Sequence, residues 1–318
     1  MSDLGRTGAG LLALAVVASL PSLPIELDRH FYSVAILAFS VASLSMSWNI
    51  LGGFAGQISL GHAAFFGIGA LVTRQLWLAG SSLAIALLAA VGAAILVSIV
   101  IGAPVLRLRG VYFSIATLAV GEAIRITIGN VLPGVSALPP GTLRDYSFVS
   151  RYFIALGVLA LTIGTSLWLK RSKLGLGMMA LREDEEAARA TGINVFGHKL
   201  TAFVISATLA ALAGGAFGYF HVSYYPAFAF GPQWTFDALV VVFVGGIGTI
   251  LGPLVGSAFF VFIRDLLAVR LVDLHVIIFG LLFIVIVLTM PGGLVEGGIR
   301  LRRKASAAVG AARHRRRK

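Results

Sequence analysis

The sequence contains no cysteine among its 318 residues. Disulfides, thiolate metal sites and cysteine nucleophiles are therefore excluded, and redox chemistry does not indicate a compartment. Charged residues are also scarce, at 12%, whereas average soluble chains carry about a quarter. Because 58% of the residues are hydrophobic and the mean hydropathy is +0.96, a soluble domain could not cover this much apolar surface. The composition excludes a soluble globular protein and favours one embedded in a membrane.

Motifs for nucleotide and metal chemistry are missing as well. No Gly-x-x-x-x-Gly-Lys-Ser/Thr loop occurs, so the chain cannot hold ATP phosphates in the usual cradle. Energy for any pumping must then come from a partner or from an ion gradient. The six histidines form no paired motif, and the carboxylates lie mostly outside the apolar segments. We therefore expect no metal, no catalytic residues and no cofactor in this chain, which disfavours an integral membrane enzyme.

The charges that are present are mostly basic and unevenly placed. Lys and Arg number 25 against 13 Asp and Glu, a net charge of +12, and nine of the basic residues lie in 300–318. Because this stretch directly follows an apolar segment, an anionic lipid surface is favoured over nucleic acid as its counterpart. We expect residues 300–318 to form a disordered, basic cytoplasmic tail.

Long uncharged apolar runs make up most of the remaining sequence. A membrane helix needs about 20 mostly apolar residues, and the gaps between ionisable residues supply nine or ten such spans. They are residues 7–25, 31–51, 58–78, 82–104, 111–132, 152–169, 200–220, 235–270 and 274–295. Within 235–270, glycines and a proline either break one helix or separate two short ones.

The distribution of basic residues favours ten spans over nine. With ten, both termini and residues 105–110 and 170–199 share one side, which then holds 18 of the 25 basic residues, as the positive-inside rule expects of the cytoplasm. The sequence thus predicts an all-α fold, a polytopic membrane helix bundle with broken glycine-rich helices and a single transmembrane domain over 1–299. The alternative for 7–25 is a cleaved signal peptide, because Arg6 precedes a short apolar run.

One span carries a pair of opposite charges. Glu122 and Arg125 are three residues apart, so they lie on one helix face, and Thr117 extends the polar stripe. A charge within a span costs about 2.5 to 3.5 kcal/mol on insertion, so the pair needs an explanation. Two explanations stay open: an ion pair that holds two helices in register, or the lining of a transport path.

The segment 49–62 has the composition of a broken helix. Its glycines and its polar side chains are Gly52, Gly53, Gly56 and Gly61, and Asn49, Gln57, Ser59 and His62. The freed backbone groups of such a segment need protein or water partners, and transporters tend to hold substrates there. We expect these polar residues, together with Thr117, Glu122 and Arg125, to line a substrate path. A lone histidine, however, is more often a packed residue with one hydrogen bond than a proton carrier.

A second glycine cluster follows about 190 residues later. It contains Gly245, Gly246, Gly248, Gly252 and Pro253. Paired glycines, a short polar stretch, Leu-Gly and a small-residue helix recur in both clusters, so the two could form a parallel internal repeat. We expect the glycines of both clusters to act as hinges in broken helices.

Residues 170–199 are the one long charged stretch between spans. The sequence predicts a short helix over 183–193, because acidic residues cluster where its N-terminal turn would lie and alanines follow. Gly192 can supply the left-handed conformation that ends a helix. The plain alternative is a solvated loop helix without special purpose.

Several motifs resemble those of one family. Glu186-Ala187-Ala188, then three residues and Gly192, fits the Glu-Ala-Ala pattern of bacterial ABC importer permeases, whose cytoplasmic helix docks in a cleft of the ATPase. Further motifs follow the order seen in permeases of branched-chain amino acid ABC importers: Gly56 to Gly67, Arg107 to Phe113, Thr117-Leu118 with Glu122 and Arg125, Leu181 through Asn194, Lys199 to Ser206, and Gly245-Gly246 through Gly252-Pro253. Over about residues 31–290 the chain resembles the longer of the two permease types in these systems.

The resemblance implies a multi-pass subunit of the bacterial inner membrane within a heteromeric importer. Its partners would be a second permease, two subunits that bind ATP and Mg²⁺, and an extracytoplasmic solute-binding protein. The residues implied to couple the chain to the ATPase are Arg182, Glu183, Asp184, Glu185, Glu186, Ala187, Ala188, Gly192 and Ile193. The substrate would be a branched-chain amino acid or a related solute such as urea or a short amide. A stand-alone transporter or channel driven by protons through Glu122 and His62 is the alternative.

Overall fold

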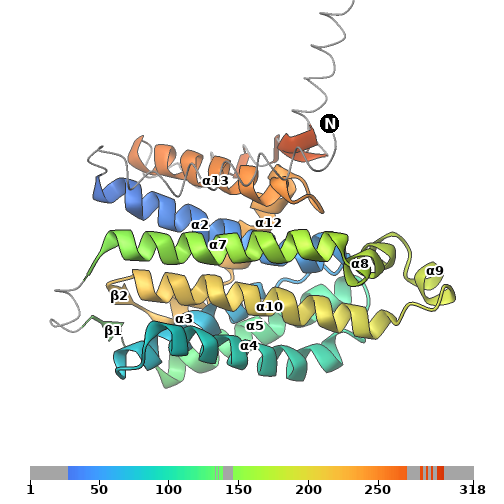
Figure 1. Cartoon of the computed structure of the whole chain (residues 1–318), viewed down its shortest axis with the longest axis horizontal. Coiled ribbons are helices and arrows are strands. Elements are labelled where there is room, and N and C mark those ends of the chain that lie inside the picture. The colour runs from blue at the N-terminus through green and yellow to red at the C-terminus, as the bar shows by residue number, and fades with distance from the viewer. Residues whose placement is uncertain are drawn as a thin grey trace, which may run out of the picture.

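The computed structural model describes residues 28–132, 134, 136–138, 146–270, 280–281, 284–285, 288 and 292–296. The expected span 7–25 and the basic tail 300–318 lie outside these residues, as does most of the expected span 274–295. The described residues form a bundle of long helices that run side by side along one axis (Figure 1).

The described elements are almost entirely helical, as the sequence predicts. In chain order the helices are α2 (Arg29–Asn49), the π-helix η2 (Ile50–Phe54), α3 (His62–Leu78), α4 (Leu83–Val105), α5 (Val111–Val131), α7 (Phe148–Arg171), α8 (Lys173–Glu183), α9 (Glu185–Ala190), α10 (Val195–Phe220), α11 (Pro226–Ala229), α12 (Gln233–Gly245) and α13 (Leu251–Arg270). Two short strands, β1 (Ser136–Ala137) and β2 (Ser223–Tyr224), pair antiparallel.

Within the described residues, six helical segments are long and apolar enough to cross a membrane. They are Arg29–Phe54, Leu83–Val105, Val111–Val131, Phe148–Arg171, Val195–Phe220 and Pro226–Gly245. Each overlaps a span that the sequence predicts, because uncharged apolar runs of this length have few other stable environments. A total of ten spans stays a prediction.

Two expected boundaries are wrong, each at a capping residue. The span expected from residue 58 becomes helical only at His62, with Gly61 as its N-cap. The segment 235–270, for which the sequence allows one broken helix or two short ones, is two helices, separated by a link in which Gly246 and Gly248 have φ values of +125° and +75°. The single helix expected over 183–193 is instead two elements, since Asp184 is extended and ends α8.

The core lies where α3 and α10 cross beside α2 and α12. The rings of Phe66 and Trp234 stack with centroids 4.6 Å apart, and Phe217 packs edge-on against Trp234. A Cβ at Gly69 or at Gly214 would overlap the backbone of the facing helix, so both glycines allow a close helix crossing. The centre of the bundle is therefore rigid, and its less regular parts lie toward the ends of the helices.

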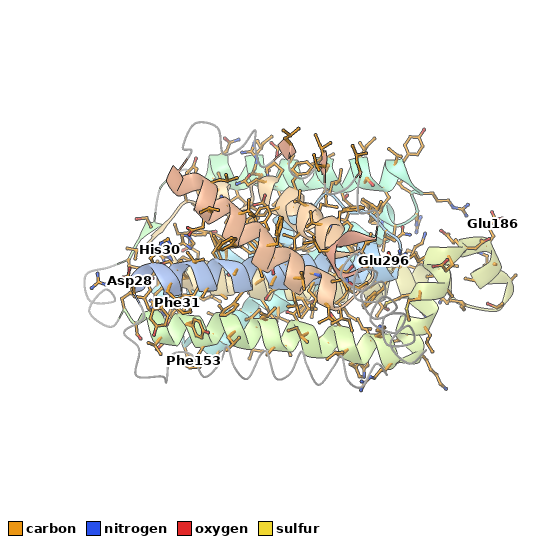
Figure 2. All side chains as sticks on the ribbon, turned by 90° about the horizontal axis from the view of Figure 1, so that it is seen from above. Asp28, His30, Phe31, Phe153, Glu186 and Glu296 are labelled. Atoms are coloured by element: carbon orange, nitrogen blue, oxygen red, sulfur yellow. The ribbon has the colours of Figure 1, made fainter. Side chains whose placement is uncertain are left out.

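The two ends of the bundle differ in construction. Asp28, His30 and Phe153 lie at one end, and Glu186 lies at the far tip of the other, where α8 and α9 project beyond the long helices (Figures 1 and 2). The strand pair β1–β2 lies at the end opposite α9 (Figure 1).

Two buried arginines fasten the chain at the strand end. The Arg74 guanidinium donates to the carbonyl oxygens of His221 and Val222 at 2.7 and 2.9 Å, so it satisfies backbone groups that α10 leaves open at its C-terminus. Arg151 lies over the rings of Tyr146 and Tyr219.

Burial lowers the pKa of His221, so this ring is neutral near pH 7.

Candidate functional site

The segment 55–61 turns back from the end of η2 and runs beside the helix that precedes it. The Trp48 indole Nε1 donates to the Ser59 carbonyl oxygen at 2.7 Å, which places Ser59 more than one turn back from the end of the helix. The first turns of α5 satisfy the rest of the segment: Ser114 Oγ donates to the Ile58 carbonyl at 2.6 Å, and the Leu60 N–H donates to Thr117 Oγ1 at 3.0 Å. The broken helix thus obtains the protein partners that its freed backbone groups need.

His62 and Ser59 lie inside the bundle rather than on its surface. His62 is buried, and its Nε2 is hydrogen-bonded to Ser206 Oγ, which itself donates to the Ser47 carbonyl at 2.8 Å. The Gly61 N–H donates to Ser59 Oγ at 3.3 Å. These contacts fix the start of α3 against α2 and α10.

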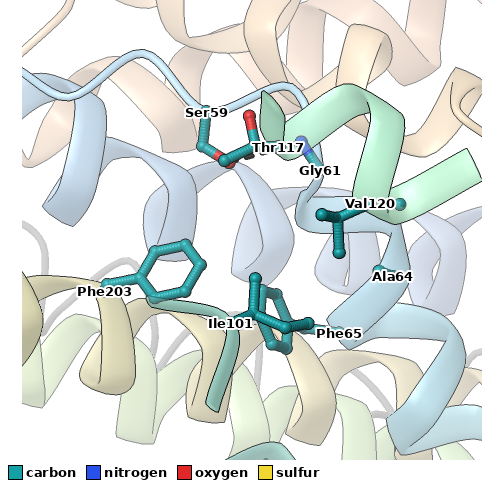
Figure 3. Close-up of a pocket in the computed structure, with 9 residues that line it drawn as sticks. Ser59, Gly61, Ala64, Phe65, Ile101, Thr117, Val120 and Phe203 are labelled. Atoms are coloured by element: carbon teal, nitrogen blue, oxygen red, sulfur yellow. Dashed lines mark hydrogen bonds between the residues drawn. The ribbon is translucent and has the colours of Figure 1, made fainter. Parts of the chain in front are cut away.

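A small cavity opens beside this broken segment. Its interior has room for about one water molecule, and its walls come from the start of α3, the middle of α5 and the facing parts of α4 and α10 (Figure 3). The lining residues are Ser59, Gly61, Ala64, Phe65, Ile101, Thr117, Val120, Gly121 and Phe203. Its lining is mostly apolar. Ser59 and Thr117, both expected on a path, lie at its edge.

Asn49 joins the two glycine clusters. Its amide Nδ2 donates to the Thr249 carbonyl at 2.9 Å, and its Oδ1 accepts from the Gly248 N–H at 2.8 Å. The side chain is buried, so it acts as a clamp between the end of α2 and the link between α12 and α13. The two clusters lie about 190 residues apart in the sequence, and the structure brings them into contact.

Arg182 contacts both clusters from α8. Its Nη1 donates to the Gly53 carbonyl oxygen at 2.6 Å, and the same nitrogen is the nearest neighbour of a Cβ built at Gly248. A Cβ at Gly56 would lie 3.1 Å from the Arg182 Cα. Gln57, in contrast, is half-buried and bonds only locally, to the Ala55 carbonyl at 3.3 Å.

The helices α8 and α9 form a small unit with its own core and caps. Asp184 Oδ1 accepts from the N–H groups of Glu186 and Ala187, and Gly192, with a φ of +87°, ends the turn after α9. Leu181 and Ala188 pack with Val195, and Ile193 covers them. Glu183 and Glu186 are exposed at the surface of this unit.

Glu185 carries the ion pairs that attach α9 to the bundle. Its carboxylate lies 2.6 Å from Lys199 Nζ of α10, 3.6 Å from Arg189 and 4.0 Å from Arg109, which precedes α5. The Lys199 side chain is only 4% exposed, whereas that of Glu185 is 25% exposed. One carboxylate thus connects α9 with two other parts of the chain.

Glu122 and Arg125 form a two-pronged ion pair on α5. Arg125 Nε donates to Glu122 Oε2 at 2.8 Å, and Arg125 Nη2 donates to Oε1. Both side chains are about one-third exposed, at 37% and 34%. Phe113 and Thr117 are the buried residues of α5, so most of this helix faces outward. The charges therefore neutralise each other within one helix and do not join two helices.

Comparison with known proteins gives the family. The profile described as "Branched-chain amino acid transport system / permease component" matches residues 31–287. The chain belongs to this permease family. It is therefore a multi-pass protein of the inner membrane, in agreement with its apolar helices.

The relatives of this permease are transport proteins. It is 29% identical to the high-affinity branched-chain amino acid transport system permease protein LivM of Salmonella typhimurium and to that of Escherichia coli, over 90% of this chain and 74% of each relative. It is 33% identical to the permease protein LivH of Escherichia coli over 44% of either chain. No solved structure matches the chain.

Several residues that organise the site escape sequence reasoning. Trp48 and Ser114 look like ordinary members of apolar helices, and their partners, the carbonyls of Ser59 and Ile58, lie 11 and 56 residues away. The run of three alternate serines before Trp48 (Ser43, Ser45 and Ser47) is the one signal of a close, hydrogen-bonded helix contact. In the part of the chain that the structure describes, no group of three acidic or histidine side chains could hold a metal ion.

Proposed function

We propose that this permease is the membrane subunit of an ATP-driven importer for branched-chain amino acids or a related small solute. The observation that carries the proposal is the α8–α9 unit, which projects from one end of the bundle and presents Glu186 at its tip (Figure 2). A short, capped helix pair that projects from the bundle suits docking against a partner. The family membership supports an ATPase as that partner, with ATP and Mg²⁺ bound there and not in this chain.

The orientation of the helices supports ten spans with both termini in the cytoplasm. If α9 is cytoplasmic, α2 runs inward, because Asp28 lies at the opposite end from Glu186 (Figure 2). A preceding span over 7–25 would then start in the cytoplasm. Gly293 lies against Gly246 at the inner end of α12, which favours a last span that returns to the cytoplasm before the basic tail. A single transmembrane domain over 1–299 fits this arrangement.

We place the translocation path along the outward face of α5. Its charge pair is poorly suited to lipid, because each charge costs about 2.5 to 3.5 kcal/mol in a span, whereas a water-filled path or a facing protein would accept it. The neighbouring α4 is uniformly apolar and mostly exposed, which suits lipid. The second permease would complete the path opposite α5, and a solute-binding protein would deliver substrate at the strand end. In this arrangement Asn49, Ser59 and His62 shape the broken helices behind the path.

Affinity purification of the tagged chain from its native membranes tests the assembly. We expect two nucleotide-binding subunits and a second permease in the eluate, together with ATPase activity. The variant Glu186→Arg should retain the second permease and lose the ATPase subunits, while Arg29→Gln, at the opposite end of the bundle, should keep both. A chain that is recovered alone, under conditions that preserve other membrane complexes, would contradict the proposal.

A further inference from the structure

Arg182 lies where three separate parts of the chain meet. It is next to last in α8, two residues before the Asp184 cap of α9, so it belongs to the docking unit. Its guanidinium reaches the first glycine cluster at the Gly53 carbonyl and lies against the second at Gly248. Two glycines beside it leave room for this residue: a Cβ at Gly248 would overlap Nη1, and one at Gly56 would crowd the backbone of Arg182.

The two glycine clusters are joined to each other as well. A Cβ at Gly53 would lie 2.8 Å from the Gly248 nitrogen, so the backbones are in close contact. Asn49 adds hydrogen bonds to both the Gly248 N–H and the Thr249 carbonyl. Displacement of one cluster must therefore displace the other or break these two hydrogen bonds.

Each cluster lies where one helix gives way to the next. The first begins within η2, which continues α2, and ends at Gly61 directly before α3. The second runs from the last residue of α12 into the first turn of α13. Their glycines with positive φ allow backbone rotation that other residues resist, which is the usual property of a hinge. A force applied at Arg182 would thus act on the inner ends of four helices together.

We propose that Arg182 is a positioning residue that transmits movement of the α8–α9 unit to both glycine hinges, with Asn49 keeping the hinges in step. This inference rests on the proposed function, because it requires an ATPase that moves the unit. The charge-assisted bond to the Gly53 carbonyl is the direct link. Loss of this bond should leave docking intact and weaken the coupling of ATP hydrolysis to transport.

The absence of native cysteine allows a direct measurement of hinge movement. In the whole purified importer, a cysteine introduced by Ile247→Cys, beside Gly248, is labelled with maleimide without nucleotide and with ATP plus vanadate. We expect the labelling rate to differ between the two states, and we expect this difference to disappear when Arg182→Gln is added. Uptake by Arg182→Gln should fall at least about tenfold, the factor that one charge-assisted hydrogen bond provides. ATP hydrolysis and co-purification of the ATPase should persist.

The matched control is Arg171→Gln, which removes an exposed arginine from the last turn of α7. It should keep both the nucleotide-dependent labelling and the uptake. Arg182→Lys, which retains the charge on a single donor nitrogen, should lie between. Should Arg182→Gln fail to reach the membrane, Arg182→Lys carries the same comparison. The inference is overturned if the labelling rate at position 247 in the parent is the same with and without nucleotide. It is also overturned if the difference in rate persists in Arg182→Gln, or if Arg182→Gln no longer co-purifies with the ATPase. If the parent itself binds no ATPase, the proposed function fails first.

Discussion

At the scale of single residues, the chain uses buried polar groups to fasten elements that are distant in sequence. Lys199 and Glu185 are the clearest example, because the two partners differ in how many opposite charges lie near them. Glu185 has two further cations within 4.0 Å, whereas Lys199 is almost fully buried beside this one carboxylate. Breaking a buried pair costs most when it leaves a charge without compensation.

This imbalance predicts an order of stabilities. Glu185→Ala should destabilise the folded chain by about 1–3 kcal/mol, because it leaves a buried ammonium group without its carboxylate. Lys199→Met should cost less, since Glu185 keeps Arg189 and Arg109. Thermal unfolding of the purified protein in one detergent measures both, and the double variant should recover part of the loss. Equal melting temperatures for the two single variants would contradict this argument.

The polar residues themselves are visible in the sequence, but their partners are not. Asn49 and His62 stand out as candidates because they interrupt an apolar or small-residue stretch, and Arg182 is indicated by the family resemblance. Their hydrogen bonds go to Thr249, Ser206 and Gly53, each more than a hundred residues away and two of them through backbone carbonyls. Every residue has a backbone carbonyl, whatever its side chain. The sequence therefore does not indicate which carbonyl accepts such a hydrogen bond.

Trp48 offers a second test at this scale. Trp48→Phe keeps the aromatic packing and removes the donor to the Ser59 carbonyl, which leaves a buried backbone acceptor without its partner. We expect a loss of about 1–3 kcal/mol in the free energy of unfolding. Faster maleimide labelling of a cysteine introduced by Ser59→Cys should accompany it, because the segment 55–61 is then held less tightly. Trp77→Phe, at the outer end of α3, is the matched control, and its labelling should equal that of the parent.

At the scale of elements, how well the sequence predicts the end of a helix depends on what ends that helix. The span expected over 82–104 is the helix Leu83–Val105, because this apolar run is unbroken and stops just before Arg107 and Arg109. Boundaries set by glycine conformation or by a cap are less visible, and α3 and the α8–α9 break are misplaced for this reason. A left-handed glycine is recognised only through the contacts that require it, and those contacts are tertiary.

The turn after α9 should be required for uptake. Gly192→Pro should abolish transport, because proline fixes φ near −65° where the chain requires +87° after α9. Immunoblots of membranes should still show the chain, since the change lies outside the long helices. Gly164→Ala in α7 is a suitable control, as an added Cβ there meets no neighbour within 4 Å. Normal uptake by Gly192→Pro would refute the role of this unit in coupling.

At the scale of the whole molecule, the outer surface divides into two kinds of helix. Exposed residues of α4 are apolar throughout, whereas α5 exposes an ion pair among its apolar residues. Sequence alone identifies both helices as spans, but it does not tell which neighbours each one has in the membrane. That distinction depends on burial within the bundle, where α5 contributes few buried side chains.

The division predicts different surroundings for two exposed isoleucines. Ile126 of α5 is 51% exposed and Ile99 of α4 is 45% exposed, so they match in residue type and in surface. In sealed vesicles that contain the whole importer, a cysteine introduced by Ile126→Cys should react with a water-soluble maleimide or become crosslinked to the second permease. A cysteine introduced by Ile99→Cys should do neither until detergent is added, because lipid surrounds it and thiolates do not form in hydrocarbon. If the two cysteines behave alike, α5 does not face the path, and its charge pair must be stabilised at a lipid-facing surface.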